Sequence, residues 1–207
     1  MTGARAELGA VPWGPVTAGL AAGTGLAVLD LTVWPGGPGS QVLWLVAGLL
    51  GGSVAIALDD PTATITGAVP TPRRRRAAIR LLTAVVALAV WGGYVARATD
   101  LVSTPGDPVS WLALVLIGTS LALAAAGSAA ALGRAGAGEP GSVVESLAVV
   151  LVLGLMILPL PRDLAPYDVS GRWTDSTALW TVAGALGVAA LLWGAGDPWR
   201  RGFGQRR

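Results

Sequence analysis

The sequence predicts an all-α fold, a polytopic bundle of six transmembrane helices that forms one domain over residues 1–207. Three observations lead to this prediction. Hydrophobic residues make up 53% of the chain and charged residues 13%, about half the charged share of a typical soluble domain. Six apolar runs each approach the roughly 20 helical residues that cross a bilayer core. The runs also lack the alternation of polar and apolar residues that marks the strands of a membrane barrel.

The six predicted spans leave no segment long enough for a soluble domain. They cover about residues 14–34, 41–58, 79–96, 110–132, 142–160 and 177–196. The first run is too long for a signal peptide and the second follows after six residues, so we expect the first span to be retained.

Local sequence signals support the ends of these spans. The segment 35–39 contains only Pro and Gly, which predicts a tight turn and hence an antiparallel hairpin of the first two spans. Ser142 and Glu145 form the S-x-x-E pattern of a capping box at the start of the fifth span. Pro159 and Pro161 close that span, because proline cannot continue the helical hydrogen-bond pattern.

The positions of the basic residues predict the orientation, because cytoplasmic loops keep an excess of cations. Every basic residue is an arginine. With the N-terminus in the cytoplasm, the inner side carries most of them: Arg5, Arg73, Arg74, Arg75, Arg76, Arg80, Arg134, Arg200, Arg201, Arg206 and Arg207. The outer side then holds Arg97, Arg162 and Arg172. We therefore expect both termini inside and a multi-pass protein of the bacterial plasma membrane.

The strongest candidate site is the charged loop between the second and third spans. It carries Asp59 and Asp60 and then a run of arginines: Arg73, Arg74, Arg75, Arg76 and Arg80. One interpretation is a topological signal that also binds anionic lipid headgroups. The other is a surface on which a cytoplasmic partner protein docks. Nucleic acid is not an expected partner, because the run is short, adjoins the bilayer and has no interleaved aromatic residues.

Asp30 is a candidate intramembrane polar site. An ionisable residue within a span predicts a functional role, because it is unfavourable in hydrocarbon. Asp30 lies about one turn from Trp34 at the predicted outer boundary, so we expect its carboxylate to reach interfacial water.

Two glycine pairs are candidate sites of helix packing. They are Gly19-x-x-x-Gly23 in the first span and Gly48-x-x-x-Gly52 in the second. Small residues let helix backbones approach closely in lipid, where no hydrophobic effect drives helices together. We expect close helix contacts at both pairs, within the chain or with a partner.

The composition argues against an enzyme. The chain has neither His nor Cys, so imidazole bases, thiolate nucleophiles and the common zinc sites are excluded. Without Lys, the chain cannot contain a Walker A motif. We therefore expect no catalytic residue, no cofactor and no metal site.

Four short segments carry a resemblance to a known group of proteins. They are Leu58-Asp59-Asp60-Pro61, the segment from Val69 to Arg76, Leu158-Pro159-Leu160-Pro161-Arg162-Asp163 and Gly196-Asp197-Pro198-Trp199-Arg200-Arg201. The chain resembles small six-span membrane proteins of actinobacteria that accompany ABC-type ATPases as permease-like subunits. The resemblance implies a non-catalytic membrane subunit of an ABC transporter, with ATP hydrolysed by a separate cytoplasmic ATPase subunit.

The sequence leaves a second function open. A membrane anchor, assembly factor or regulatory protein without transport activity would use the same charged loop and the same glycine-lined helix faces. A homodimer is a further expectation, by analogy, because six helices with short loops rarely enclose a full transport pathway alone.

Overall fold

The computed structural model describes residues 9, 11–33, 40–59, 73–102, 111–137, 139–157 and 173–196. Every regular element within these residues is a helix, as the sequence predicts. The elements are α2 (Trp13–Val33), α3 (Ser40–Ala57), α5 (Arg73–Arg80), α6 (Leu82–Val102), α7 (Trp111–Ala135), α8 (Pro140–Ile157) and α9 (Trp173–Gly194).

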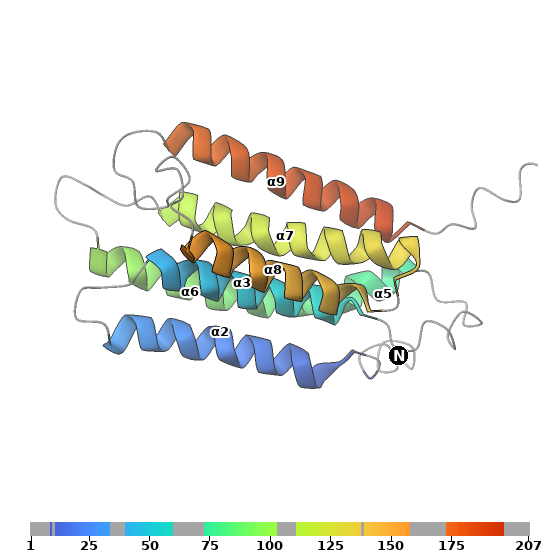
Figure 1. Ribbon diagram of the computed structural model, residues 1–207, viewed down its shortest axis with the longest axis horizontal. Coiled ribbons are helices and arrows are strands. Elements are labelled where there is room, and N and C mark those ends of the chain that lie inside the picture. The colour runs from blue at the N-terminus through green and yellow to red at the C-terminus, as the bar shows by residue number, and fades with distance from the viewer. Residues whose placement is uncertain are drawn as a thin grey trace, which may run out of the picture.

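The six long helices run antiparallel to their neighbours in sequence and form an elongated bundle (Figure 1). As a result, the start of α2 and the end of α9 lie at the same end of the bundle. The short helix α5 lies there too, and we call this the arginine end because α5 begins with Arg73–Arg76. The ends of α3 and α7 and the start of α8 complete it.

Four stretches of helix are long and apolar enough to cross a membrane, which supports a membrane protein. They are Trp13–Val33, Ala77–Leu101, Leu114–Ala135 and Thr177–Gly194. The other two long helices contribute the shorter apolar segments Val42–Ala57 in α3 and Pro140–Val150 in α8. The described residues thus contain candidates, by length and composition, for four of the six predicted spans.

Two helix boundaries differ most from the prediction. The third span was expected to end at residue 96, but α6 continues to Val102, so Arg97 and Asp100 lie on its last turns and not in a loop. The segment before this span was expected to be a loop, but residues from Arg73 onward form α5. One helical hydrogen bond continues beyond α5, since the Leu81 amide donates to the Ala77 carbonyl at 2.9 Å.

Helix α3 lies at the centre of the bundle and contacts α2, α6, α7 and α8. Three consecutive small residues of α3 each meet a different helix. Gly51 faces Ala122 of α7, Gly52 faces Glu145 of α8, and the Ser53 side chain packs over Gly19 of α2. A Cβ atom at Gly52 would lie 2.9 Å from the Glu145 Cγ atom, closer than ordinary contact, so a larger side chain there would displace Glu145.

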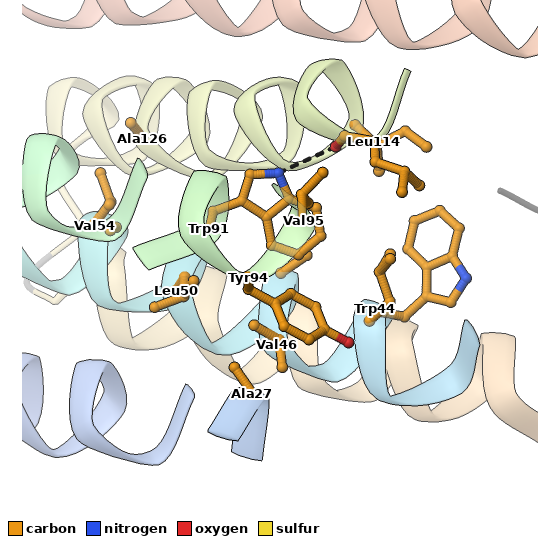
Figure 2. Close-up of a cluster of buried hydrophobic side chains, with 14 residues drawn as sticks. Ala27, Trp44, Val46, Leu50, Val54, Trp91, Tyr94, Val95, Leu114 and Ala126 are labelled. Atoms are coloured by element: carbon orange, nitrogen blue, oxygen red, sulfur yellow. Dashed lines mark hydrogen bonds between the residues drawn. The ribbon is translucent and has the colours of Figure 1, made fainter. Parts of the chain in front are cut away.

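The apolar core lies between α2, α3, α6 and α7 (Figure 2). Trp91 of α6 lies directly over Gly118 of α7, where a Cβ atom would overlap the indole ring. The indole Nε1 donates a hydrogen bond to the Leu114 carbonyl at 3.1 Å, shown by the dashed line in Figure 2. This bond gives the buried indole N–H an acceptor.

Helix α9 packs along α7 through small residues. Gly184 meets Ser120, Gly187 meets the backbone at Leu123, and Gly194 meets Ala130. The outward face of α9 is apolar, with Leu186 65% and Leu192 67% exposed. Such a face suits contact with lipid.

Candidate functional site at the arginine end

Arg80, the last residue of α5, holds this helix against the end of α3. Its side chain is 3% exposed. The guanidinium Nη1 donates to the carbonyls of Leu58, at 3.3 Å, and Asp59, at 2.6 Å. Carbonyls at a helix end lack partners within the helix and carry partial negative charge, so a cation there is stabilising. The position of α5 is therefore fixed by α3.

Asp59, just beyond the end of α3, caps the start of the neighbouring helix α8. Its carboxylate, on a residue that is 4% exposed, accepts hydrogen bonds from the amides of Gly141 and Ser142. The Ser142 hydroxyl also donates to it, at 3.1 Å. The first amides of a helix have no intrahelical acceptor, and an aspartate satisfies them with a favourable charge.

The contact between α3 and the start of α8 leaves no gap. A Cβ atom at Gly141 would lie 2.6 Å from the Ile56 Cα atom, so glycine is needed there. The predicted capping box is wrong at this point, because α8 begins at Pro140 and its cap comes from another helix. Ser142 gives its hydroxyl to Asp59, and Glu145 packs against Gly52.

A third charged residue, Arg134 at the end of α7, binds the end of α9. Its Nη1 donates to the carbonyls of Trp193 and, at 3.1 Å, Gly196. The guanidinium carbon lies 4.7 Å from the centre of the Trp193 ring, a cation–π distance. This role was not predicted, because an arginine in the last turn of a helix signals binding to that helix's own last carbonyls, and Arg134 binds those of α9.

The predicted docking residues thus separate into two groups. Asp59 and Arg80 are buried and bind other parts of the same chain, so they do not face a partner. Arg75 is exposed, and Arg73, Arg74 and Arg76 also lie in α5. Asp60 lies outside the described residues. The docking prediction itself stays a prediction, carried by the first turns of α5.

Those turns have an unfavourable arrangement of charge. Four arginines occupy the start of α5, and its first turn contains no acidic residue. The amide dipoles of a helix already place partial positive charge at its N-terminus, so cations there are destabilising and an anionic group is stabilising. The start of α5 would therefore gain from an anionic group that comes from outside the helix.

Asp30 is more deeply buried within the protein than the sequence predicts. It is 2% exposed, and the Tyr94 hydroxyl donates to its Oδ2 atom at 2.6 Å. The expectation that it reaches interfacial water is therefore wrong. Asp30 lies on the same face of α2 as Gly23 and Ala27, which turns toward the bundle. Tyr94 is itself buried and meets the Trp91 ring, with 5.9 Å between the ring centres.

The two glycine pairs occupy different contacts. Gly19 and Gly23 both face α3, at Ser53 and Leu50, which is the hairpin of the first two long helices. Gly52 instead faces α8, and Gly48 is buried. In the part of the chain that the structure describes, no three acidic side chains gather.

Comparison of the chain with protein-family models, with curated proteins and with solved structures found no match.

Proposed function

We propose that this protein crosses the bacterial plasma membrane six times, with both termini in the cytoplasm. We further propose that it is the non-catalytic, permease-like subunit of an ABC-type transport complex. A separate cytoplasmic ATPase then hydrolyses ATP, and the arginine end is the cytoplasmic end to which it binds.

Helix length supports two further spans. Helices α3 and α8 each contain 18 residues, about 27 Å at 1.5 Å per residue, which approaches the thickness of a bilayer core. Both are packed among the four longer helices and antiparallel to their sequence neighbours. The arginines of α5 and Arg134 then share one side of the membrane, as expected for cytoplasmic segments.

The observation that carries the docking proposal is the run of arginines at the start of α5, whose first turn contains no acidic residue. Arg80 holds the helix on α3, so the arginines at its start occupy a defined position at the end of the bundle. An acidic surface on a soluble protein would neutralise that charge and the helix dipole together. A soluble partner that displaces α5 on binding would also displace α3, the central helix of the bundle.

The docking proposal is tested by replacing Arg73, Arg74, Arg75 and Arg76 with glutamine and purifying the protein from its host in a mild detergent. We expect an ATPase to accompany the unaltered protein and to be lost from the variant. The matched control replaces Arg200, Arg201, Arg206 and Arg207, which removes the same charge from the same predicted side. Equal recovery of the ATPase with both variants would refute docking at α5.

Orientation is checked in the same variants, because removal of arginines can disturb insertion. The chain contains no cysteine, so one cysteine introduced at Arg75 reports its side of the membrane through an impermeant thiol reagent. We expect labelling after lysis and none in intact cells. If no ATPase accompanies even the unaltered protein, the anchor, assembly or regulatory function replaces the transport function.

A further inference from the structure

We propose that Asp59 is a positioning residue that couples the docking helix α5 to α8. When a bound partner displaces α5, the start of α8 then moves with it. This inference rests on the proposed function, because it takes α5 to be the place where a partner binds. It adds a defined connection from that place into the bundle.

The connection passes through two different parts of one residue. The backbone carbonyl of Asp59 accepts the hydrogen bond from Arg80, which holds α5. The side-chain carboxylate of Asp59 accepts three hydrogen bonds from the start of α8. A displacement of α5 is therefore applied to the residue that caps α8.

The surroundings of Asp59 make this connection stiff. The residue is 4% exposed, so its hydrogen bonds face little competition from water. At Gly141 the backbones of α3 and α8 are in direct contact, and α8 cannot move closer without α3 moving away. Packed interfaces of this kind shift between discrete arrangements and do not deform continuously.

No other extensive contact joins the two helices in the described part of the bundle. Helix α5 packs against the start of α6, whereas α8 packs against α3 and α7. Movement of α5 reaches α8 most directly at the end of α3, where Asp59 is bonded to both, and otherwise through the packing of α6 against α3 and α7.

The two links can be cut separately. Asp59→Ala removes the carboxylate and frees the start of α8, but it keeps the backbone carbonyl to which Arg80 binds. Arg80→Gln weakens the other link and leaves the carboxylate in place. Asp100→Ala and Arg97→Gln are matched controls, because both residues are exposed near the opposite end of α6.

The readout is hydrogen exchange at the amides of Gly141 and Ser142 in the full-length protein in nanodiscs. The probe for the acidic partner surface is an octaglutamate peptide, whose binding is measured separately. In the unaltered protein we expect the peptide to slow exchange of both amides by at least about threefold. In Asp59→Ala we expect the peptide to bind without any change at these amides.

A cap without a coupling role would make exchange faster in Asp59→Ala but would not make α8 respond to a peptide on α5. Because Asp59→Ala can disturb folding, Asp59→Asn serves as a second variant. It keeps one carbonyl oxygen as an acceptor, so we expect a reduced response to the peptide in a folded protein. Binding of the peptide to the unaltered protein with no change at Gly141 and Ser142 would overturn the coupling.

Failure of the peptide to bind would count against the proposed docking and not against the coupling. In that case the comparison of Arg80→Gln with Arg97→Gln decides. Faster exchange at Gly141 and Ser142 in Arg80→Gln alone, by at least about threefold, supports the connection through Asp59. Equal exchange in the two variants overturns it.

Discussion

The same substitution, Gly→Ala, should have opposite effects at two glycines of this bundle. Gly187 of α9 lies against α7, and a Cβ atom there would be 2.5 Å from the Leu123 carbonyl carbon and 2.6 Å from the Ala124 nitrogen. Gly93 of α6 is exposed, and a Cβ atom there would meet nothing within 4 Å. The substitution adds the same methyl group at both positions, but only at Gly187 does that group meet a neighbouring helix.

The sizes of the two effects follow from these distances. Ordinary contacts of a Cβ atom begin near 3.4 Å, so an alanine at Gly187 must separate α9 from α7 by about 1 Å. Overpacking of this kind costs about 1–3 kcal/mol. Alanine favours a helix over glycine by up to about 1 kcal/mol at both sites. Gly93→Ala should thus stabilise by up to about 1 kcal/mol, and Gly187→Ala should destabilise by up to about 2 kcal/mol.

The difference between the two variants is informative because the helix propensity term cancels and the packing term is left. We would measure it by unfolding each variant in detergent micelles with increasing mole fractions of dodecyl sulfate. The tryptophans of the chain, nine in number, provide the fluorescence signal. Unfolding midpoints that are equal within error, or a lower midpoint for Gly93→Ala, would refute the close contact of α7 with α9.

Three further substitutions test the polar contacts, the first two by the same unfolding assay and the third by hydrogen exchange. Tyr94→Phe removes the hydrogen bond to Asp30 and should destabilise by about 1 kcal/mol, whereas an unchanged midpoint would mean that this bond adds nothing. Trp91→Phe leaves the Leu114 carbonyl without its indole donor and should lower stability by about 1 kcal/mol; a gain would contradict the structure. Arg134→Gln should speed hydrogen exchange in the last turn of α9 severalfold and leave exchange in α2 as it is.

The helical class could be predicted from sequence because the solvent imposes it. Backbone groups in hydrocarbon must bond within their own segment, so apolar runs of this length become helices whatever their local propensities. The ends were less predictable. Arg97 and Asp100 were expected outside the span because they are charged, yet a long side chain such as that of Arg97 can reach the interface while the helix continues. The arginine run also read as loop because it is polar, although arginine is a good helix former.

The faces of the helices were harder to predict than the helices themselves. In a soluble helix the buried face is the apolar one, whereas in lipid both faces are apolar and the usual periodicity is lost. The signal left in α2 is the spacing, by three or four, of residues that are mostly small or polar. The buried residues of α2 are Val16, Gly19, Gly23, Ala27 and Asp30. Sequence analysis identified both glycines but treated Asp30 separately and so placed it too close to water.

Small residues and charged residues perform different tasks in this bundle. Gly51, Gly52 and Ser53 determine how closely the neighbours approach α3, but they do not distinguish one apolar helix from another. Asp59 does distinguish, because its carboxylate requires unpaired amides, which only the start of a helix presents. It thereby joins the end of α3 to Gly141 of α8, which lies 82 residues further along the chain, beyond two intervening long helices. The backbone carbonyl of the same buried aspartate accepts the hydrogen bond from Arg80. Asp59 therefore determines both which helix pairs with the end of α3 and where the cationic helix α5 lies.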